Sequence, residues 1–451
     1  MSLTSQQNKQ RKIMLVTLEP ISRSMAGPAI RAVEMAKQLA GEFAVTVASP
    51  VAQPVEEQLA PIAGVNILTG ANRQTMYREA LANDILIIQS NVLRPFPKLA
   101  ELGKYLVVDL YDPYLFSVLV QYKNEKVAAD ASYRLMHKVL EQHMLNADFS
   151  ICASEIQRDY WIGRYCALGR LTPVLYDFDP SMRKLIDVVP FGRETLAPVR
   201  NGPGLREEID AIGPDDVVLL WGGGIWDWFD PLTVIAAVAK AKDRVPNLRL
   251  VFMGMKSPNP KVPIMKMARD AIELSERLGL TGKHVFFKEG WIPYEKRVNY
   301  LLDADIAVSS HFDLPETRYS FRTRILDYLW CGLPVLSTGG DPLSEMIDKA
   351  HAGLALPYKD EDAWCEAIVR LAGDKDIRAR YSEASLQLSN EFTWDKTCKA
   401  LVRFCREPYH LPQHVKITMP SVFERARAVY ARGGGDLVIK RSREIISDLL
   451  G

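Results

Sequence analysis

The fold is decided first by residues 12–49, KIMLVTLEPISRSMAGPAIRAVEMAKQLAGEFAVTVAS. This stretch opens with a short apolar run of the kind that is buried in parallel sheets. A loop containing Gly27 comes next, followed by an amphipathic segment from Ala29 to Leu39 and a second apolar run, FAVTVAS. The order strand, glycine loop, helix, strand predicts the opening of a doubly wound α/β domain.

Four more apolar runs continue this pattern through the first half of the chain. They are DILIIQS (84–90), YLVVDLYDP (105–113), DFSICAS (148–154) and LIDVVPFG (185–192). A long helical pattern from about Ala128 to Leu145 precedes the third of these runs. We therefore expect a first Rossmann-like domain over residues 1–192.

The pattern breaks at residues 193–215, where prolines and glycines interrupt the periodicity, and then starts again. The predicted strands of the second half are DVVLLWGGG (216–224), LRLVFMG (248–254), HVFFKEG (284–290), DIAVSS (305–310) and PVLSTGG (334–340). One helix is expected to begin at Asp230-Pro231 and another at about Arg322. Two further helices are expected over about 262–278 and about 294–303. This order predicts a second βαβ domain over residues 193–390, and the last 40 residues are expected to form two short helices.

Composition excludes several classes of protein. The chain has 451 residues with 56 basic and 55 acidic side chains, a net charge of +1, and neither half is a basic block. Binding to nucleic acid requires clustered Lys and Arg, so nucleic acid is not expected as the main partner. No apolar run approaches the eighteen residues of a membrane span, and the polar N-terminus predicts no secretory signal.

The cysteines and histidines predict a cytoplasmic protein without a metal site. Six scattered cysteines form no CxxC pair, which is typical of reduced thiols. His410 and His414 lie at helical spacing but lack the glutamate motif of a metal site. The D-x-D strings Asp177-Phe178-Asp179 and Asp303-Ala304-Asp305 are interpreted as structural, and no metal is expected.

The most informative stretch for chemistry is ETRYSFRTRILDYLWCGLPVLSTGG, residues 316–340. Open parallel sheets bind ligands where their strands end, so two facing sheets form a cleft. A helix starting near Ser320 would place Arg322 and Arg324 in its first turn, where cations oppose the helix dipole, and this favours phosphate binding. The alternative is that the arginines pair with Glu316 and Asp327.

Small and aromatic residues follow the first strand of the second half, in WGGGIWDWFDP (221–231). Gly223 and Gly224 allow a ligand to approach the backbone. The aromatic side chains Trp226, Trp228 and Phe229 suit either a base or sugar face, or packing between domains. Both interpretations remain open from the residues alone.

The ordered segments of the second half resemble the GT-B glycosyltransferases of the retaining family-4 type. The resemblance extends over roughly residues 217–372 and is carried by HVFFKEGWIP, NYLLDADIAVSS, YSFRTRILD, LWCGLPVLSTGG and HAGLALP. MAGPAIRAVEMAKQLA (25–40) resembles the glycine loop and helix of the first domain. The helices after Glu391 resemble the C-terminal crossover, so residues 391–451 are expected to return to the first domain.

The chain departs from the family pattern at several positions. The two acids of the family's E-x7-E motif fall on Tyr319 and Asp327, and its G-F-G becomes Ser320-Phe321-Arg322. The Arg and Lys that grip the donor diphosphate are absent from residues 222–231, and the family's histidine after the fourth strand corresponds to Tyr111. Arg322 and Arg324 are predicted to supply the missing charge.

The resemblance implies transfer of a sugar from a nucleoside diphosphate-sugar to an acceptor hydroxyl with retention at the anomeric carbon. It needs no cofactor beyond that substrate, and the enzyme mainly positions groups and stabilises charge. The predicted catalytic residues are Arg322, Arg324 and Glu316. The predicted donor-binding residues are Gly27, Gly223, Gly224, Tyr319, Ser320, Phe321, Thr323 and Asp327, and the acceptor-side candidates are Arg31, Tyr111, Asp112 and Arg158.

Other functions are compatible with the same residues. A degenerate protein that binds nucleotide-sugars as a scaffold or subunit would explain the lost Glu and Arg/Lys. A nucleotide-sugar epimerase or phosphorylase on the same scaffold is a second enzyme class, and a dehydrogenase is disfavoured because MAGPAIR is not G-x-G-x-x-G. The acceptor is expected to be a sugar, a lipid-linked molecule or another small molecule, with membrane contact that is at most peripheral, at the inner membrane face.

Overall fold

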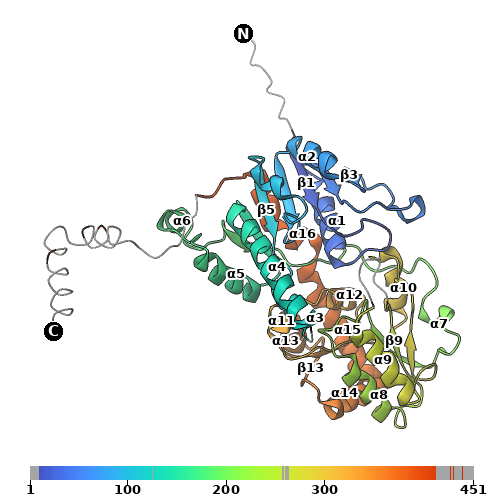
Figure 1. Ribbon diagram of the computed structural model, residues 1–451. Coiled ribbons are helices and arrows are strands. Elements are labelled where there is room, and N and C mark those ends of the chain that lie inside the picture. Colours follow the sequence, from blue (N-terminus) through green and yellow to red (C-terminus); the bar gives the residue numbers. More distant parts are fainter. Residues whose placement is uncertain are drawn as a thin grey trace.

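A computed structural model describes residues 10–123, 125–255, 259 and 264–412, together with 427, 430 and 439. The two short helices expected in the last 40 residues, and His414, lie outside the described residues. The described chain forms two parallel sheets, one in each half, and helices lie on both faces of each sheet (Figure 1). The predicted fold class, two doubly wound α/β domains of the GT-B type, is confirmed.

The first sheet has seven parallel strands in the order β3-β2-β1-β4-β5-β6-β7. Its register pairs Val16 of β1 with Ala48 of β2 on one side and with Ile88 of β4 on the other. The strands are β1 (Lys12–Val16), β2 (Ala44–Ala48), β3 (Val65–Leu68), β4 (Ile85–Gln89), β5 (Tyr105–Asp109), β6 (Phe149–Cys152) and β7 (Ile186–Val188). The strand order reverses between β1 and β4, which is where an open α/β sheet binds its ligand.

The second sheet has six parallel strands in the order β10-β9-β8-β11-β12-β13. They are β8 (Val217–Trp221), β9 (Leu248–Phe252), β10 (Val285–Phe287), β11 (Ile306–Ser309), β12 (Val335–Thr338) and β13 (Gly353–Leu356). The order reverses between β8 and β11. Strand β8 is entirely buried, which explains its unbroken apolar sequence VVLLW.

Most helices connect successive strands and cover the sheets. In the first half these are α1 (Gly27–Leu39), α2 (Arg73–Leu81), α3 (Tyr114–Gln121), α4 (Lys126–Asn146), α5 (Glu155–Ala167) and α6 (Pro173–Phe178). The second half contains α7 (Leu205–Glu208), α8 (Pro231–Ala241), α9 (Lys266–Arg277), α10 (Arg297–Leu302), α11 (Pro315–Tyr319), α12 (Arg324–Trp330), α13 (Pro342–Ala350), α14 (Glu361–Gly373) and α15 (Lys375–Ser389). Short 3-10 helices are η1 (Val55–Glu57), η2 (Pro97–Glu101), η3 (Tyr294–Lys296) and η4 (Asn390–Phe392).

The last two helices, α16 (Trp394–Thr397) and α17 (Lys399–Arg406), return to the first half. Figure 1 shows α16, at the red end of the colour bar, among the blue elements β1, β5 and α1. The returning segment bonds to the segment that leaves the first half, since the amide of Arg193 donates to the carbonyl of Phe392 and that of Trp394 to the carbonyl of Arg193. Phe404 of α17 stacks on Phe149 of β6 with ring centroids 4.9 Å apart. The expected crossover is therefore present, and we propose 1–192, 193–390 and 391–451 as the limits of the three parts.

The expected helix start at Asp230-Pro231 is confirmed. Asp230 caps α8 by accepting a hydrogen bond from the amide of Thr233, and Pro231 occupies the first helical position, where its missing N–H costs nothing. Strand β3 was not among the predicted strands, because VNIL is only partly buried at the sheet edge and carries a weak apolar signal.

The predicted helix start near Ser320 is wrong. Helix α11 ends at Tyr319, the backbone of Ser320 is extended at φ −82° and ψ 149°, and α12 begins only at Arg324. The physical reason is local competition, because the Ser320 hydroxyl and the Arg322 guanidinium both bind Glu316 and hold the intervening backbone out of the helix. Arg322 therefore lies before the helix and not in its first turn.

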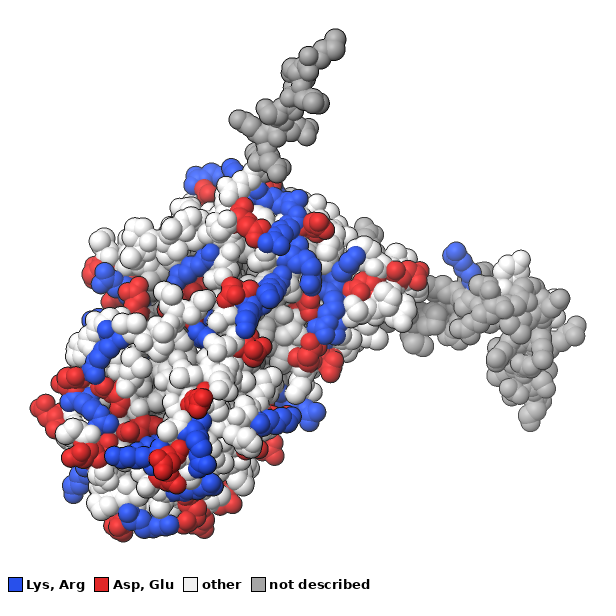
Figure 2. All heavy atoms as spheres, turned by 180° about the vertical axis from the view of Figure 1, so that it is seen from behind, with Lys and Arg blue, Asp and Glu red and all other residues white. Residues whose placement is uncertain are grey.

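Surface charge is mixed. Lys and Arg side chains alternate with Asp and Glu over the face shown in Figure 2, and no field of one sign covers it. Within the described residues, no helix has the length and apolar character needed to cross a membrane. The six cysteines are all unpaired thiols.

Candidate functional site

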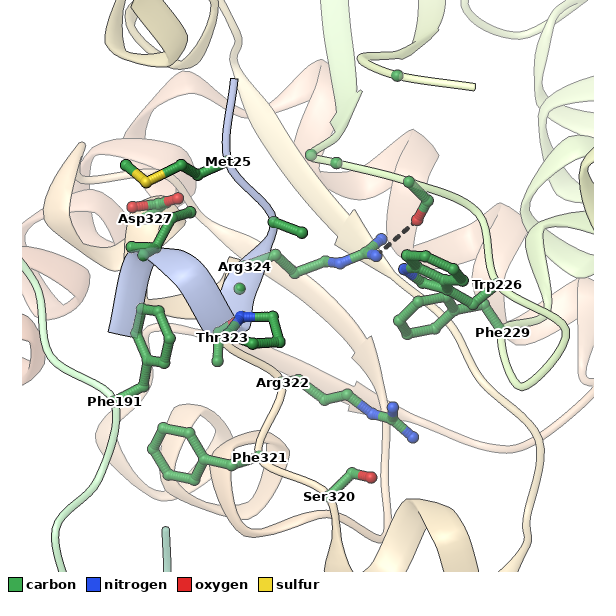
Figure 3. A pocket seen from close by; sticks show the side chains of 18 of the residues that line it. Met25, Phe191, Trp226, Phe229, Ser320, Phe321, Arg322, Thr323, Arg324 and Asp327 are labelled. Carbon is green, nitrogen blue, oxygen red and sulfur yellow. Dashed lines mark hydrogen bonds between the residues drawn. The ribbon is translucent and has the colours of Figure 1, made fainter. Parts of the chain in front are cut away.

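A cavity of about 370 Å³ lies between the two sheets, at the ends of β1 and β5 on one side and of β8 and β9 on the other. Figure 3 shows the side chains that line it. The cavity brings together twelve of the fifteen residues in the predicted catalytic, donor and acceptor sets: Gly27, Tyr111, Asp112, Gly223, Gly224, Glu316, Ser320, Phe321, Arg322, Thr323, Arg324 and Asp327. Arg31, Arg158 and Tyr319 are not part of its lining.

Arg322 forms an ion pair with Glu316 through both of its terminal nitrogens. The guanidinium donates to both carboxylate oxygens of Glu316, at 3.1 and 2.7 Å, and the Ser320 hydroxyl donates to the same carboxylate at 2.6 Å. Both charged residues are buried, with 5% and 2% of their surfaces exposed. The alternative that Arg322 pairs with Glu316 is therefore observed, and a bidentate pair of this kind leaves little of the arginine charge for a ligand.

Arg324 has no carboxylate partner among the described residues. Its guanidinium donates to the carbonyl of Gly224 at 2.8 Å, drawn as the dashed line in Figure 3, and its Nη1 is buried without a hydrogen bond. The ring faces of Trp221 and Phe229 lie 5.0 and 4.1 Å from the guanidinium carbon. Burial lowers the pKa of Arg324 to about 10, against the opposing effect of the Tyr328 hydroxyl. Positive charge held in this way is what an anionic ligand would neutralise.

A buried histidine and aspartate lie next to the two arginines. Nε2 of His311, which follows β11, is 3.4 Å from Oδ2 of Asp341, the N-cap of α13, and neither side chain is exposed to solvent. Burial, together with the positive charges of Arg322 and Arg324, holds the pKa of His311 well below its ordinary value. The imidazole is therefore neutral and adds no charge to the site.

Asp327 pairs with Arg297. The alternative drawn from the sequence, in which Asp327 pairs with Arg324, is not observed. Nε of Arg297 donates to Asp327 at 3.1 Å, and Arg297 also contacts Glu194 at 3.3 Å. Burial raises the pKa of Asp327, and the charge of Arg297 opposes that rise. Figure 3 shows Asp327 on the opposite side of the view from the guanidinium of Arg324, beside Met25, so the pocket has two separate polar ends.

Tyr319 points out of the pocket into the contact between the two halves. Its ring stacks on Phe116 of α3, with centroids 5.5 Å apart, and lies 4.9 Å from the ring of Tyr160 of α5. The side chain of Gln157 donates to the carbonyls of Tyr319 and Tyr111 at 2.6 and 2.7 Å, which joins the two halves again. The position that carries a glutamate in the family motif therefore serves as a contact between the domains.

On the first-domain side, Gly27 and Asp112 line the cavity and Arg31 lies behind them. Arg31 is completely buried, donates to both oxygens of Asp109 at 2.7 and 3.0 Å, and lies 5.0 Å from the Tyr111 ring. Arg31 therefore forms a structural ion pair and does not line the cavity. Its effect is to hold the end of β5 in place.

Arg158 is similarly removed from the cavity. The Arg158 guanidinium donates to the carbonyls of Ile186 and Ser181, and the residue is 7% exposed. Both bonds fasten α5 to the segment around β7, so the side chain has a structural role in the first half.

The aromatic residues of the glycine loop are stacked against each other. The ring centroids of Trp226 and Trp228 are 5.4 Å apart and the ring planes are 5° from parallel. Both rings line the cavity together with Phe229. A Cβ at Gly224 would lie 3.2 Å from Trp291, so a larger residue would crowd that wall of the pocket. The loop thus provides an aromatic wall at the Arg324 end.

The aspartates of the two D-x-D strings do not line the cavity. Asp303 pairs with Arg200 at 2.8 Å, and Asp305 accepts from the amide of Val218 at 2.9 Å. Asp179 closes a turn through Ser181, and Asp177 is exposed to solvent. Within the described ranges, no group of three or more His, Cys, Asp or Glu residues is placed to hold a metal ion. His410 contacts Asp148 and stacks on Tyr105, which ties the returning segment to β5.

Sequence reasoning did not find several lining residues, among them Glu19, Phe191, Trp291 and Arg297. Glu19 could have been predicted in the same way as Gly27, because both residues follow β1 at the carboxyl edge of the sheet, where ligands bind. Arg297 starts a helix with no motif around it, and only the folded chain brings it to Asp327. The Trp291 indole donates to the carbonyl of Met25 across the cleft at 3.2 Å.

Comparison with known proteins agrees with this arrangement. Residues 217–374 match the family described as Glycosyl transferases group 1. Among curated relatives, the D-inositol 3-phosphate glycosyltransferase of Saccharomonospora viridis is 28% identical over 233 residues, which is 50% of this chain and 52% of the relative. That of Corynebacterium urealyticum is 26% identical over 185 residues, 41% of each chain. The chain thus spans about half the length, or less, of these curated relatives.

Solved structures match over a longer part of the chain. Sucrose-phosphate synthase from Thermosynechococcus elongatus superposes with a TM-score of 0.63 at 16% identity, covering 88% of this chain and 99% of the other. Anabaena HepE in complex with UDP-glucose superposes with a TM-score of 0.61 at 14% identity, and the match covers 88% of this chain and 100% of the other. At this level of identity the likeness shows a common fold. The second half, over residues 217–374, is therefore similar to the group 1 glycosyltransferases, and the chain as a whole has the GT-B fold of these solved structures.

Proposed function

We propose that this protein transfers a sugar from a nucleoside diphosphate-sugar to an acceptor hydroxyl, with retention at the anomeric carbon. The family match supports the reaction type. The cavity adjoins β1 and β8, the strands at which both sheets reverse their order, and this is the expected place for a nucleotide in an α/β protein.

One observation carries the proposal, namely that the buried guanidinium of Arg324 has no carboxylate partner among the described residues. The glycine loop at residues 222–231 contains no Arg or Lys, yet the carbonyl of Gly224 in that loop binds Arg324 of α12. A cation delivered from the helix therefore lies where a diphosphate would contact the loop. Burial among Trp221 and Phe229 keeps water from screening it, which strengthens its attraction for phosphate.

The other pocket residues suggest how the rest of the donor is held. Asp327, at the opposite end from Arg324, accepts the ribose hydroxyls, and Gly27 and Gly223 let the diphosphate approach the backbone. Glu316 and Ser320 face the hydroxyls of the sugar, with Arg322 as the residue that positions Glu316. The backbone amide of Thr323 contributes to the phosphate site.

The comparisons guide the choice of substrates to test. Anabaena HepE was solved with UDP-glucose and the curated relatives are named for D-inositol 3-phosphate, so a UDP-hexose donor and a polyol or sugar acceptor are the first candidates. We further propose a role in polysaccharide, glycolipid or other glycoconjugate synthesis in the cytoplasm, with at most peripheral contact at the inner membrane face.

The test is binding of nucleotides to the wild-type protein and to Arg324→Gln. We expect UDP, GDP or ADP to raise the melting temperature of the wild type, because a ligand at 100 times its Kd stabilises the folded state by about 2.7 kcal/mol. The shift should vanish in Arg324→Gln, since the diphosphate loses its unpaired cation. Arg318→Gln, a matched change at an exposed residue of α11, should keep the shift. Equal stabilisation of all three proteins would refute the donor site.

A binding subunit without transferase activity is the second candidate, and the position of Tyr319 favours it. The side chain at this motif position packs on Phe116 and Tyr160 and does not line the cavity. Release of UDP from UDP-glucose by the wild-type protein would exclude this candidate. Nucleotide binding with no turnover on any donor would establish it.

A further inference from the structure

Arg297 lines the cavity, and its three guanidinium nitrogens each have a different acceptor. Nε donates to Oδ2 of Asp327 at 3.1 Å, Nη1 to the carbonyl of Tyr294 at 2.7 Å, and Nη2 to Glu194 at 3.3 Å. The guanidinium carbon also lies 3.7 Å from the centroid of the Tyr294 ring, and only 7% of the side chain is exposed. A guanidinium with this many partners acts on a ligand mainly through those partners.

Asp327 presents to the cavity the carboxylate oxygen that Arg297 does not bind. Oδ2 accepts the hydrogen bond from Arg297, whereas Oδ1 has no hydrogen-bond partner among the described residues. Of the Asp327 side chain, 31% is exposed, and the residue lines the cavity. Because an aspartate side chain is short, a bond that fixes one of its oxygens also sets the direction of the other.

The stability of α10 does not account for an arginine at its first position. A cation at the start of a helix opposes the helix dipole. Of the two carboxylates that offset this charge, Glu194 comes from the segment that connects the halves and does not line the cavity, whereas Asp327 of α12 does. Arg297 thus couples the start of α10 to the acid at this end of the cavity.

We infer that Arg297 is the positioning residue of the nucleoside end of the cavity: it holds one oxygen of Asp327 so that the other accepts a hydroxyl of the ribose. This inference rests on the proposed function, in which Asp327 binds the ribose and Arg324 the diphosphate. It also names the substrate class. The donor is a ribonucleoside diphosphate-sugar, selected over the deoxyribonucleoside form that lacks this hydroxyl.

The direction of the carboxylate matters because of the strength of the bond that it makes. A hydroxyl that donates to an ionised carboxylate contributes more than a neutral hydrogen bond, and the bond weakens steeply when its angle is poor. Without Arg297 the carboxylate is free to rotate. The ribonucleotide should then lose affinity, while the deoxy form, which does not use this oxygen, should lose little.

The experiment measures Kd by titration calorimetry for the nucleoside diphosphate that stabilises the wild type most, and for its 2′-deoxy and 3′-deoxy forms. We expect the wild type to bind one of the two deoxy forms about 10- to 100-fold more weakly than the ribonucleotide. In Arg297→Gln this ratio should fall below about threefold, because only the ribonucleotide loses affinity. Arg297→Lys keeps the charge but not the planar fork, and should give an intermediate ratio.

Arg206→Gln is the matched control. Arg206 is also a partly buried arginine of the second half, and it pairs with Asp305 at 3.2 Å. It does not line the cavity, so the variant should keep the wild-type ratio even where it is less stable. A purely structural role of Arg297 predicts the same result for the Arg297 variants.

The inference is overturned if the ratio stays within about twofold of the wild type in the Arg297 variants. It is also overturned if the wild type binds the ribonucleotide and both deoxy forms equally. Circular dichroism establishes that each variant is folded, and Arg297→Lys decides alone if Arg297→Gln is not. A wild type that binds no nucleotide at all refutes the proposed function, and the inference falls with it.

Discussion

Two arginines separated by a single residue have opposite electrostatic environments in this protein. Arg322 gives both ends of its guanidinium to the buried carboxylate of Glu316, whereas Arg324 contacts a carbonyl and two aromatic faces. Only the second retains uncompensated charge. The first is therefore expected to matter mainly for the fold and for the orientation of Glu316, and the second mainly for binding.

This difference predicts the stability of the Arg322 and Glu316 variants. Arg322→Gln should destabilise the protein by about 3–5 kcal/mol, because it leaves the Glu316 carboxylate buried without its partner. The double variant Arg322→Gln/Glu316→Gln leaves no buried charge without a partner. Its loss in the free energy of unfolding should therefore be smaller than the sum of the losses of the two single variants, by about 0.5–3 kcal/mol. Urea unfolding of the four proteins measures this coupling, and strictly additive losses would contradict the pairing.

At the residue scale, most of the residues proposed from the sequence line one cavity, and the pairing of Arg322 with Glu316 was one of the two alternatives that the sequence left open. The motif order placed Gly27, Asp112 and Arg324 at strand ends, and the folded chain brings them to one cavity. The pairing of Asp327 with Arg297 could not be predicted, because these residues lie thirty positions apart and meet only in the folded chain.

At the scale of elements, the crossover helix α16 is fastened through a close contact between Gly192 and Trp394. A Cβ built on Gly192 would lie 2.5 Å from Cδ2 of Trp394, and Trp394 is 1% exposed. Its indole also packs on Phe191 with ring centroids 5.0 Å apart. The glycine is thus required by the approach of a neighbouring ring.

Gly192→Ala should consequently destabilise the protein, since the added methyl group forces the Trp394 ring out of its position. Overpacking of this kind costs about 1–3 kcal/mol, and thermal unfolding should show a lowered melting temperature. Gly163→Ala provides the matched control, because nothing lies within 4 Å of a Cβ at that position of α5. There the alanine should leave stability unchanged or raise it by about 0.5–1 kcal/mol, since alanine favours a helix. Equal effects of the two changes would contradict the packing role of Gly192.

Secondary structure with strong apolar periodicity was predictable, whereas the short helices of the site were not. The buried strands β1 and β8 have continuous apolar sequences that leave little alternative. The break between α11 and α12 depends on side chains binding to Glu316, and that contact competes with a helix whose sequence otherwise continues through Ser320.

At the scale of the whole molecule, the two halves touch through more than the connecting chain. The ring of Tyr319 lies between Phe116 and Tyr160, Gln157 binds the carbonyl of Tyr319, and Trp291 binds the carbonyl of Met25. One apolar core cluster also includes residues from both sheets and from the returning helices. The cavity exists in this form because the halves are held together.

Tyr319→Ala should therefore shift the protein toward an open arrangement. Two aromatic contacts of about 0.5–1.5 kcal/mol each would be lost, which changes the ratio of closed to open forms by roughly tenfold. Small-angle X-ray scattering should report a larger radius of gyration for the variant, and a nucleotide should reduce the difference. Tyr319→Phe keeps the stacked ring and should behave as the wild type. An unchanged radius in the alanine variant would show that other contacts suffice for closure.

The crossover also has a consequence for the order in which this protein can complete its fold during synthesis. Chains generally fold from the N-terminus as they leave the ribosome, but α17, whose Phe404 covers Phe149 of the first sheet, is made after the entire second sheet. The first half must wait, with that apolar surface uncovered, until nearly all of the chain has been translated. A fragment ending at residue 192 would keep the surface exposed permanently, so separate production of the two halves requires that residues 391–412 be supplied to the first.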